Sequence, residues 1–391
     1  MKFEQLLTLF HGTHLELQKR AARSVDIALV IRNWLFGYYI VEFEQGNANR
    51  AELYGKRLIE RLSKELTAAQ LGRGFSKRSL EQYRRFYDSY KEIAQVLPAQ
   101  SLENNLARQE IGQALTGESF ETFAANLEVL QAVSTELTKR FVLGWTHYVS
   151  LLTISSPDER SFYEIEAYEN SWGTRELERQ IASSLYERLT LSRDKAEVKK
   201  LSQKGLVIEK PSDVVKNPYV LEFLDLDEKS GYSEHELESA IIDKLEHFLL
   251  ELGKGFLFEA RQKRFTFDND HFYVDLVFYN RLLRCYVLID LKRDKLTHQD
   301  LGQMQMYVNY FDRFVKTDDE LPTIGIVLCH RKNDALVEVT LPKDSNIFAS
   351  KYQLYLPSKE EFKKQLEYAA GIEHKDDMGP HQNDPWQNKG H

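Results

Sequence analysis

The sequence has few cysteines, no long apolar run and no excess of positive charge. Its two cysteines, Cys285 and Cys329, lie in expected strands, which indicates buried, reduced thiols in a cytoplasmic protein rather than disulfides or a zinc site. No run of eighteen apolar residues predicts a membrane span, and the N-terminus lacks the apolar core of a signal peptide. A net charge of −8 argues against a protein that coats nucleic acid without specificity.

The spacing of apolar residues changes along the chain and predicts two domains. Up to about residue 195 the spacing is three to four, which is typical of helices, whereas strand-like runs appear after residue 231. We therefore expect a helical domain at 1–195, a linker and re-entry segment at 196–230, and an α/β domain at 231–370. The polar residues of 371–391 predict a disordered tail.

Within the α/β half, the expected order is helix, three strands, helix and two strands. Capping signals, turn residues and apolar runs set the expected limits. The helices are expected at 233–252, 299–315 and 362–369, and the strands at 256–267, 272–280, 284–292, 323–328 and 352–356.

Two places in the helical half have the pattern of a helix-turn-helix. In the first, Gly72 and Gly74 interrupt the helical spacing and Ser76 is a good N-cap for the next helix. In the second, Gly173 separates two helices. We expect nucleic-acid contacts from cations near these turns, although a solvated basic helix would show the same pattern. These cations are Arg73, Lys77, Arg78, Arg84 and Arg85 at the first turn, and Arg175 and Arg179 at the second.

Three charged residues interrupt the apolar strand pair at 272–292, namely Asp275, Asp290 and Lys292. Burying a charge in an apolar strand costs free energy unless the charge has a partner. Since side chains alternate along a strand, Asp290 and Lys292 share one face, and Asp275 on the neighbouring strand can converge with them.

Two helices can bring further polar residues to this face. Glu238 lies on the inward stripe of the helix before the strands, and Gln303 and Tyr307 are one turn apart on the helix after them. Glu246 and Glu251 are alternative helix carboxylates. Asp-x-Lys alone occurs often by chance, so the prediction depends on finding all these features in order.

Carboxylate oxygens are the ligands that Mg²⁺ and Mn²⁺ prefer, so Glu238, Asp275 and Asp290 predict a metal site. Lys292 beside such a site could orient or deprotonate an attacking water, or stabilise a pentavalent phosphorane. The residues alone do not separate these two roles.

The order helix Glu, strand Asp, strand Asp-x-Lys and helix Gln-x-x-x-Tyr resembles the PD-(D/E)XK nuclease superfamily. More narrowly, the chain resembles the bacterial YhcG-type nucleases over most of residues 30–365. The stretches that carry this resemblance are YGKRLIERLSKEL, GRGFSKRSL, GWTHYVSLL, SWGTRELERQI, NPYVLEFL, FLLELGKGFLFEARQ, FYVDLVFYNRLLRCYVLIDLK and GQMQMYVNYF.

The resemblance implies an α-helical N-terminal domain, winged-helix or helix-turn-helix-like, that binds DNA. It also implies an α/β C-terminal PD-(D/E)XK nuclease domain with a mixed central sheet flanked by helices. Mg²⁺ or Mn²⁺ would be bound by Glu238, Asp275, Asp290 and Leu291. Lys292 would be catalytic, with Gln303 and Tyr307 supporting the lysine or contacting phosphate.

The sequence departs from the superfamily pattern at two positions. Asp290 stands where relatives usually carry Glu, which is one methylene longer and could alter the metal geometry. Val274 precedes Asp275, where the superfamily's name has proline.

We therefore expect a metal-dependent DNA endonuclease, with a role in handling foreign or mobile DNA. Cutting both strands usually calls for two active sites, which suggests a homodimer. Two alternatives stay open at this point. The fold could serve a non-catalytic DNA-binding or regulatory protein, or the substrate could be RNA, because a metal site acts on phosphate and ignores the sugar.

Overall fold

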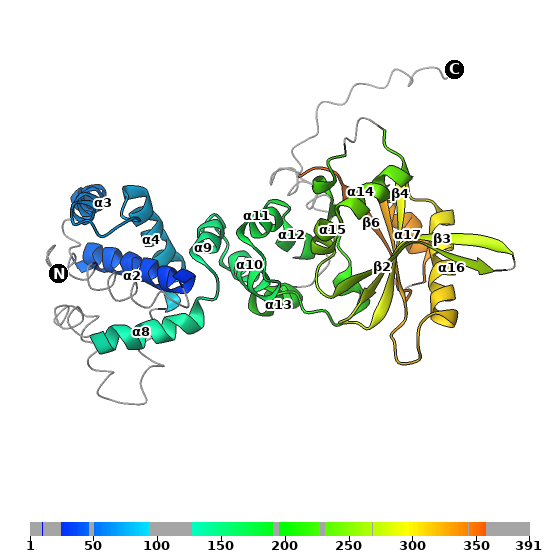
Figure 1. Cartoon of the computed structure of the whole chain (residues 1–391), viewed down its shortest axis with the longest axis horizontal. Helices are drawn as coiled ribbons and strands as arrows, with labels where there is room; N and C mark the ends of the chain where they lie inside the picture. Colours follow the sequence, from blue (N-terminus) through cyan, green and yellow to red (C-terminus); the bar gives the residue numbers. More distant parts are fainter. Residues whose placement is uncertain are drawn as a thin grey trace, which may run out of the picture. The chain divides into compact units, whose positions relative to one another are not determined.

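The computed structural model describes residues 10, 25–46, 51–93, 127–190, 195–226, 231–267, 269–342 and 344–356. The tail and the last helix expected from the sequence lie outside these residues. The chain divides into two compact units, Met1–Glu178 with Lys199–Gly205, and Arg179–Val198 with Leu206–His391. Figure 1 shows the helical first unit and the mixed second unit. In the described ranges, no helix is both long and apolar enough for a membrane crossing.

The first unit is organised around α2 (Val25–Gly46), a largely buried helix. It packs most closely on α4 (Lys77–Ser89), because Gly37 brings the two backbones together where a Cβ would overlap the main-chain carbonyl of Tyr83. Among the described residues, this unit also contains α3 (Ala51–Ala68), α8 (Leu127–Arg140), α9 (Trp145–Leu151) and α10 (Pro157–Glu169). The helix α11 (Thr174–Ala182) begins in this unit, and α13 (Lys195–Lys204) ends in it.

The glycine turn and the cap predicted before α4 are present. Gly72 and Gly74 have φ of 101° and 107°, a conformation that glycine adopts without steric cost. The Ser76 side chain accepts a hydrogen bond from the main-chain N–H of Ser79 at 3.2 Å and so caps α4. The apolar side of α4 is buried and includes Phe86, whose ring contacts Trp145, Phe141 and Tyr148.

The segment expected to be a linker contains regular structure. Besides α13 it holds two short 3-10 helices, Pro211–Val214 and Glu222–Leu224, and the strand β1 (Tyr219–Val220). The helix that follows the Gly173 turn, α11, ends at Ala182, and the chain continues as α12 (Leu185–Thr190) after Ser184, whose φ is 51°.

The second unit has a six-stranded mixed sheet with the order β1-β6-β5-β4-β3-β2. The pairs β1–β6, β6–β5 and β5–β4 are parallel, and β4–β3 and β3–β2 are antiparallel. This confirms the mixed sheet that the resemblance implies. The later strands are β2 (Phe256–Phe267), β3 (Asp270–Asn280), β4 (Cys285–Lys295), β5 (Ile324–Arg331) and β6 (Ile347–Gln353).

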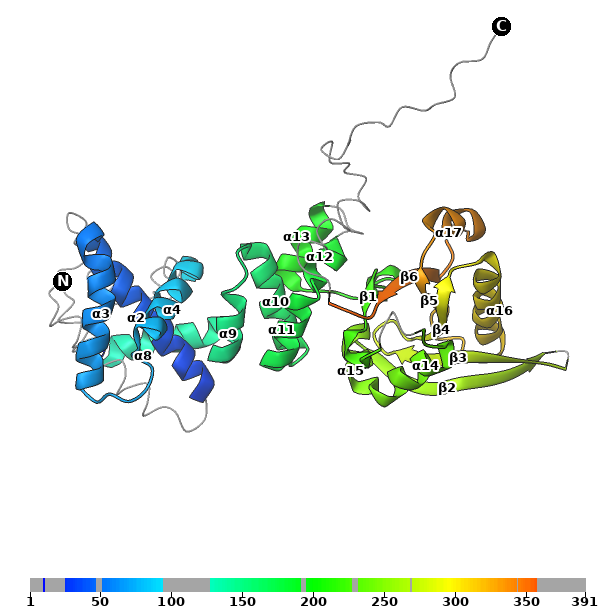
Figure 2. The same ribbon diagram turned by 90° about the horizontal axis from the view of Figure 1, so that it is seen from above.

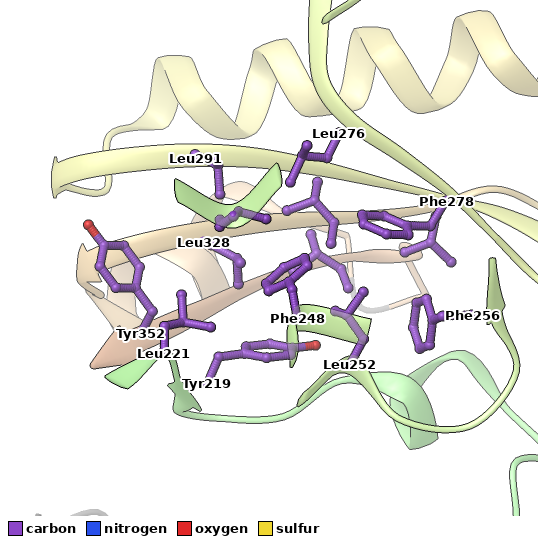
Figure 3. Close-up of a cluster of buried hydrophobic side chains, with 14 of the residues drawn as sticks. Tyr219, Leu221, Phe248, Leu252, Phe256, Leu276, Phe278, Leu291, Leu328 and Tyr352 are labelled. Carbon is purple, nitrogen blue, oxygen red and sulfur yellow. The ribbon is translucent and has the colours of Figure 1, made fainter. Parts of the chain in front are cut away.

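Helices cover both faces of the sheet, as Figure 2 shows. One face packs on α14 (Glu234–Asp243) and α15 (Leu245–Leu252) through a large apolar cluster, part of which is drawn in Figure 3. Leu276 and Leu291 point into this cluster from β3 and β4. The opposite face packs on α16 (His298–Phe314), and Leu288 belongs to that side. Neighbouring residues of β4 therefore alternate between the two faces, as predicted.

Three local features differ from the expectation. The single helix predicted over 233–252 breaks at Lys244, although the same apolar stripe continues through α14 and α15. The last strand begins at Ile347, earlier than its apolar residues indicated. A short helix, α17 (Asp334–Thr340), was not predicted, and none of its residues is buried, so it lacks an apolar stripe.

Candidate active site

Asp275 and Asp290 lie where β3 and β4 separate. The last paired residues of the two strands are Leu276 and Ile289, and the aspartates come next along each strand. Asp275 Oδ2 accepts a hydrogen bond from the main-chain N–H of Leu291 at 2.8 Å, which fixes the carboxylate beside β4. Asp290 is only 2% exposed. The end of the strand pairing thus places two carboxylates side by side on the edge of the core.

Asp290 has an environment that disfavours its negative charge. Burial raises the pKa of Asp290 well above its usual range, the charge of Asp275 raises it further, and Lys292 opposes both. Lys292 Nζ lies 2.9 Å from Asp290 Oδ2. This ammonium is the partner of the buried oxygen, although the pair lacks the alignment of a regular hydrogen bond. Two carboxylates side by side at the edge of the core fit as oxygen ligands of a divalent cation.

Lys292 is held among carboxylates. Its Nζ is also 3.9 Å from Glu234 Oε2, and its side chain is 18% exposed. Burial alone would lower the pKa of Lys292, but the charges of Asp290 and Glu234 outweigh burial and raise it. The side chain is therefore an ammonium in this structure, paired with the acid that precedes it by two residues.

Gln262 connects the predicted helix carboxylate to the aspartate pair. Its Nε2 donates hydrogen bonds to Glu238 Oε2 at 2.7 Å and to Asp275 Oδ1 at 2.9 Å. Glu238 is 3% exposed and also forms an ion pair with Arg261. The predicted inward orientation of Glu238 is present, and Arg261 compensates its charge while Gln262 donates a hydrogen bond to it.

The three predicted carboxylates do not form one ready metal cluster. Among the described residues, no group of three His, Cys, Asp or Glu side chains is arranged to hold a metal ion. Asp275 and Asp290 form the close pair, whereas Glu238 is turned towards Arg261 and Gln262. The sequence pattern could not reveal this, because the partners of Glu238 come from a strand about twenty residues later.

Gln303 and Tyr307 reach the same site from α16. Gln303 Nε2 donates a hydrogen bond to the Tyr307 hydroxyl, as their spacing of one helical turn allows. Tyr307 is 1% exposed, and burial raises the pKa of its hydroxyl, with further contributions from the charges of Asp290 and Asp275. The structure thus brings both predicted α16 residues to the aspartate pair.

The alternative helix carboxylates lie elsewhere. Glu246 is exposed, and Glu251 is completely buried in a network of cations. Arg188 Nη1 lies 2.6 Å from Glu251 Oε1, and Arg179 Nη2 lies 3.3 Å from Glu251 Oε2. Burial alone would raise the pKa of Glu251, but the charges of Arg188, Lys216 and Arg179 lower it to about 2. Glu251 is therefore a structural carboxylate.

The same network changes the interpretation of Arg179. The sequence suggested that Arg179 contacts nucleic acid, but its side chain is only 12% exposed. Its Nε lies 2.6 Å from Glu222 Oε1, in addition to the contact with Glu251. The guanidinium is thus paired with two carboxylates within the second unit, so Arg179 is not a surface cation.

The other predicted cations of the helical half are exposed. Lys77 lies 2.7 Å from Glu60, Arg84 lies 3.1 Å from Glu44, and Arg85 donates a hydrogen bond to the main-chain carbonyl of Leu152. Three more cations have no ion pair or hydrogen bond with the rest of the described chain, and these are Arg73, Arg78 and Arg175.

Sequence reasoning missed Gln262, Arg261 and Glu234. Gln262 and Arg261 lie opposite Asp275 and Leu276 once β2 pairs with β3, but an exposed polar strand residue looks the same in sequence whether it contacts solvent or a carboxylate. Glu234 was visible only as a residue of the first turn of α14, four positions before Glu238.

Comparisons with known proteins agree with this geometry. The family model described as "YhcG PDDEXK nuclease domain" matches residues 212–367, and the one described as "DUF1016 N-terminal domain" matches residues 14–188. The Escherichia coli (strain K12) protein described as "Putative nuclease YhcG" is 38% identical over 347 residues, which is 88% of each chain.

A solved structure, a repair endonuclease from Pyrococcus abyssi, aligns with 33% of this chain and 50% of its own at 18% identity, with a TM-score of 0.23. A TM-score this low is no basis for a structural inference. The identity and coverage of the Escherichia coli relative, together with the two family models, are sufficient: the chain belongs to the YhcG family of PDDEXK nucleases.

Proposed function

We propose that the chain is a divalent-metal-dependent endonuclease that hydrolyses phosphodiester bonds in DNA. The observation that supports this best is the buried pair Asp275 and Asp290 with Lys292, placed where β3 and β4 separate. Two close carboxylates, one of them buried and paired with the single charge of Lys292, repel each other unless a further cation lies between them or one takes up a proton.

Mg²⁺ or Mn²⁺ would be held by Asp275 and Asp290, with Glu238 as a further oxygen donor. Leu291 would contribute through its main chain, since its side chain is buried in the apolar cluster beneath α14 and α15. A bound ion of this kind polarises a phosphate and lowers the pKa of an attacking water. The Asp290 side chain is one methylene shorter than that of Glu. The separation of β3 and β4 after Leu276 and Ile289 is what places it close to Asp275.

Lys292 and Tyr307 would act on the phosphate. The Lys292 ammonium supplies a positive charge next to the site of reaction and stabilises the developing negative charge there. Gln303 donates a hydrogen bond to the Tyr307 hydroxyl, so this hydroxyl can donate its own hydrogen bond to a phosphate oxygen. Both side chains are largely buried, which limits their motion and keeps water from screening their charges and dipoles.

DNA would be delivered by the helical unit. Arg73, Arg78 and Arg175 are exposed cations near the two glycine turns and are available for phosphate contacts. The helix-turn-helix-like arrangement of α3 and α4 supports this assignment. We further propose that two chains act together to cut both strands, and that foreign or mobile DNA is the target.

Cleavage of supercoiled plasmid tests the proposal. With Mg²⁺ or Mn²⁺ the wild-type chain should convert the plasmid to nicked and linear forms, and Lys292→Ala should cut at least about a hundredfold more slowly, because a charge that acts on the transition state is lost. Lys295→Ala, at the exposed end of the same strand, should cut like wild type.

Equal cleavage by the wild type and Lys292→Ala would contradict the proposal. Tight, metal-independent DNA binding with no turnover on plasmid, single-stranded or branched DNA would instead identify a non-catalytic DNA-binding protein. Turnover of RNA alone would assign the same site to a ribonuclease.

A further inference from the structure

An aromatic pocket of about 380 Å³ lies between the distal part of β2 and the outer side of α16. Its size falls in the range of small-molecule binding pockets. Its lining includes four aromatic residues, Phe265, Phe267, Tyr310 and Phe314, and three polar ones, Gln305, Asn309 and Arg313. None of the lining residues is acidic. We call this site the aromatic pocket.

The aromatic rings form a stack that ends at the protein surface. Phe265 and Tyr310 are stacked, with ring centroids 4.1 Å apart and an interplanar angle of 21°. Tyr310 contacts Phe314 at a centroid distance of 5.2 Å. Phe314 and Phe267 are 65% and 62% exposed, which is unusual for neighbouring phenylalanines and indicates a binding surface.

The aromatic pocket is linked to the active site by one ring contact and by two shared elements. Phe265 meets the ring of Tyr307 edge-on at 5.5 Å, so one residue layer separates the stack from the Tyr307 hydroxyl. The two regions also share their supports, because β2 carries both Gln262 and Phe265, and α16 carries both Tyr307 and Tyr310. A strand whose phosphate lies at the aspartate pair could therefore follow these two elements to the rings.

Cations lie close to the aromatic pocket in a chain of net charge −8. Arg313 is part of the lining, and β2 exposes Lys263 and Arg264 further along the hairpin, where Lys263 pairs with Glu259 and Arg264 contacts His271. The hairpin extends past α16 in Figures 1 and 2. Exposed rings bordered by cations are the combination that binds single-stranded nucleic acid, since rings stack on bases while cations follow the phosphates.

We propose that the aromatic pocket binds an unstacked nucleobase of the strand that is cut. The base lies against Tyr310 and Phe314, Asn309 offers its amide to the base edge, and Arg313 pairs with the backbone. A base inside a duplex is covered on both faces by its neighbours, so the pocket selects DNA with an unpaired segment. This inference rests on the proposed function and names the substrate class of the same active site.

Oligonucleotide binding without divalent metal tests this inference, because no cleavage occurs under that condition. Phe314→Ala and Phe267→Ala in the full chain remove exposed rings and should leave the fold intact. Each should weaken binding of a labelled single strand roughly tenfold, because one base loses a stacking partner, and leave blunt duplex binding within about twofold. Tyr355→Ala, an exposed aromatic away from the lining, should change neither.

Fluorescence of 2-aminopurine placed along the single strand gives a second readout. We expect quenching at one position near the scissile phosphate, and loss of that quenching in Tyr310→Ala. Equal weakening of single strand and duplex, or no change in either, would overturn the inference. A change of oligomeric state in sedimentation with unchanged strand preference would also overturn it, and would assign the rings to a contact between copies.

The outcome separates this inference from the proposed function. A wild-type chain that cuts plasmid but shows no effect of the ring substitutions contradicts the aromatic pocket alone. A chain that prefers single strands through these rings but cuts nothing contradicts the nuclease assignment alone.

Discussion

Gln262 is the residue that joins Glu238 to the aspartate pair. Its single amide nitrogen donates to Glu238 and to Asp275, so both of its hydrogens are used. Its φ is 48°, in the left-handed region that residues other than glycine adopt at a cost in free energy. Because these hydrogen bonds fix the separation of two proposed ligands, we interpret Gln262 as a positioning residue for the metal site.

Gln262→Ala should weaken metal binding. Removing a residue that orients ligands typically lowers metal affinity by about tenfold or more, because the freed carboxylates must be ordered when the ion binds. Titration calorimetry with Mn²⁺ on the full chain measures this without relying on cleavage. Gln299→Ala, an exposed glutamine in the first turn of α16, is the matched control. Tighter Mn²⁺ binding in Gln262→Ala would mean that the amide competes with the ion.

At the scale of secondary-structure elements, the contact between α2 and α4 determines the first unit. Gly37 of α2 faces the main chain of Tyr83, and Tyr83 in turn donates a hydrogen bond from its hydroxyl to the Gly74 carbonyl at 2.9 Å. The glycine turn before α4 and the helix contact are therefore tied together through one tyrosine. The orientation of α4, which carries four of the predicted DNA-binding cations, depends on this contact.

Gly37→Ala should destabilise the first unit by about 1–3 kcal/mol, because the new Cβ overlaps the Tyr83 carbonyl and the helices must move apart. Thermal unfolding followed by circular dichroism measures the change. Gly173→Ala is the control, since a Cβ there has no neighbour within 4 Å and a small effect is expected. Equal stability of the two variants would show that the α2–α4 contact adjusts freely.

At the scale of the whole molecule, the buried network around Glu251 holds segments far apart in sequence together within the second unit. Arg188 comes from α12, Glu251 from α15, and the main-chain N–H of Val220 in β1 donates to Glu251 Oε1 at 3.0 Å. Every oxygen of the buried carboxylate thus has a donor. Removing one member of such a network leaves the others buried without partners.

The stability of the second unit should fall as acid protonates Glu251. Its folded pKa of about 2 lies below the ordinary 4.5, so its contribution is complete above about pH 4.5 and is lost as the pH falls towards 2. Glu251→Gln should lower the free energy of unfolding at pH 7 by roughly 3 kcal/mol and flatten its decline below pH 4.5. Urea denaturation across this pH range measures both effects.

Glu246→Gln provides the comparison for that experiment, because Glu246 is exposed on the same helix. It should leave both the stability at pH 7 and the acid dependence close to wild type. An acid profile of Glu251→Gln that matches wild type would show that other groups control acid unfolding.

Much of the second unit could be predicted from sequence, because strand alternation and helix caps are set by residues that are close together in the chain. Alternation along β4 placed Asp290 and Lys292 on one face with Leu288, and the caps placed α16 within a residue at each end. The roles of Glu238 and Glu251 could not be separated in this way. Both are buried helix carboxylates, and only their partners, which lie 23 to 72 positions away in sequence, distinguish them.

The remaining errors have a similar cause. The break at Lys244 leaves the apolar stripe of the helix unchanged, so spacing cannot reveal it. The left-handed conformation of Gln262 follows from the way β2 meets β3, and no turn residue marks it. Arg179 looked like a surface cation because Glu222 and Glu251 lie far along the chain.

The place of β6 in the sheet affects how the protein is made. β6 lies between β1 and β5, so the sheet cannot close until residues up to Gln353 have been synthesised. The ribosome delivers Glu238 through Tyr307 earlier, when β6, which pairs with both β1 and β5, has not yet been synthesised. Since domains fold in order of synthesis, the helical unit is complete before the catalytic residues gain their final support. Translation itself therefore delays assembly of the cutting site until the last strand is in place.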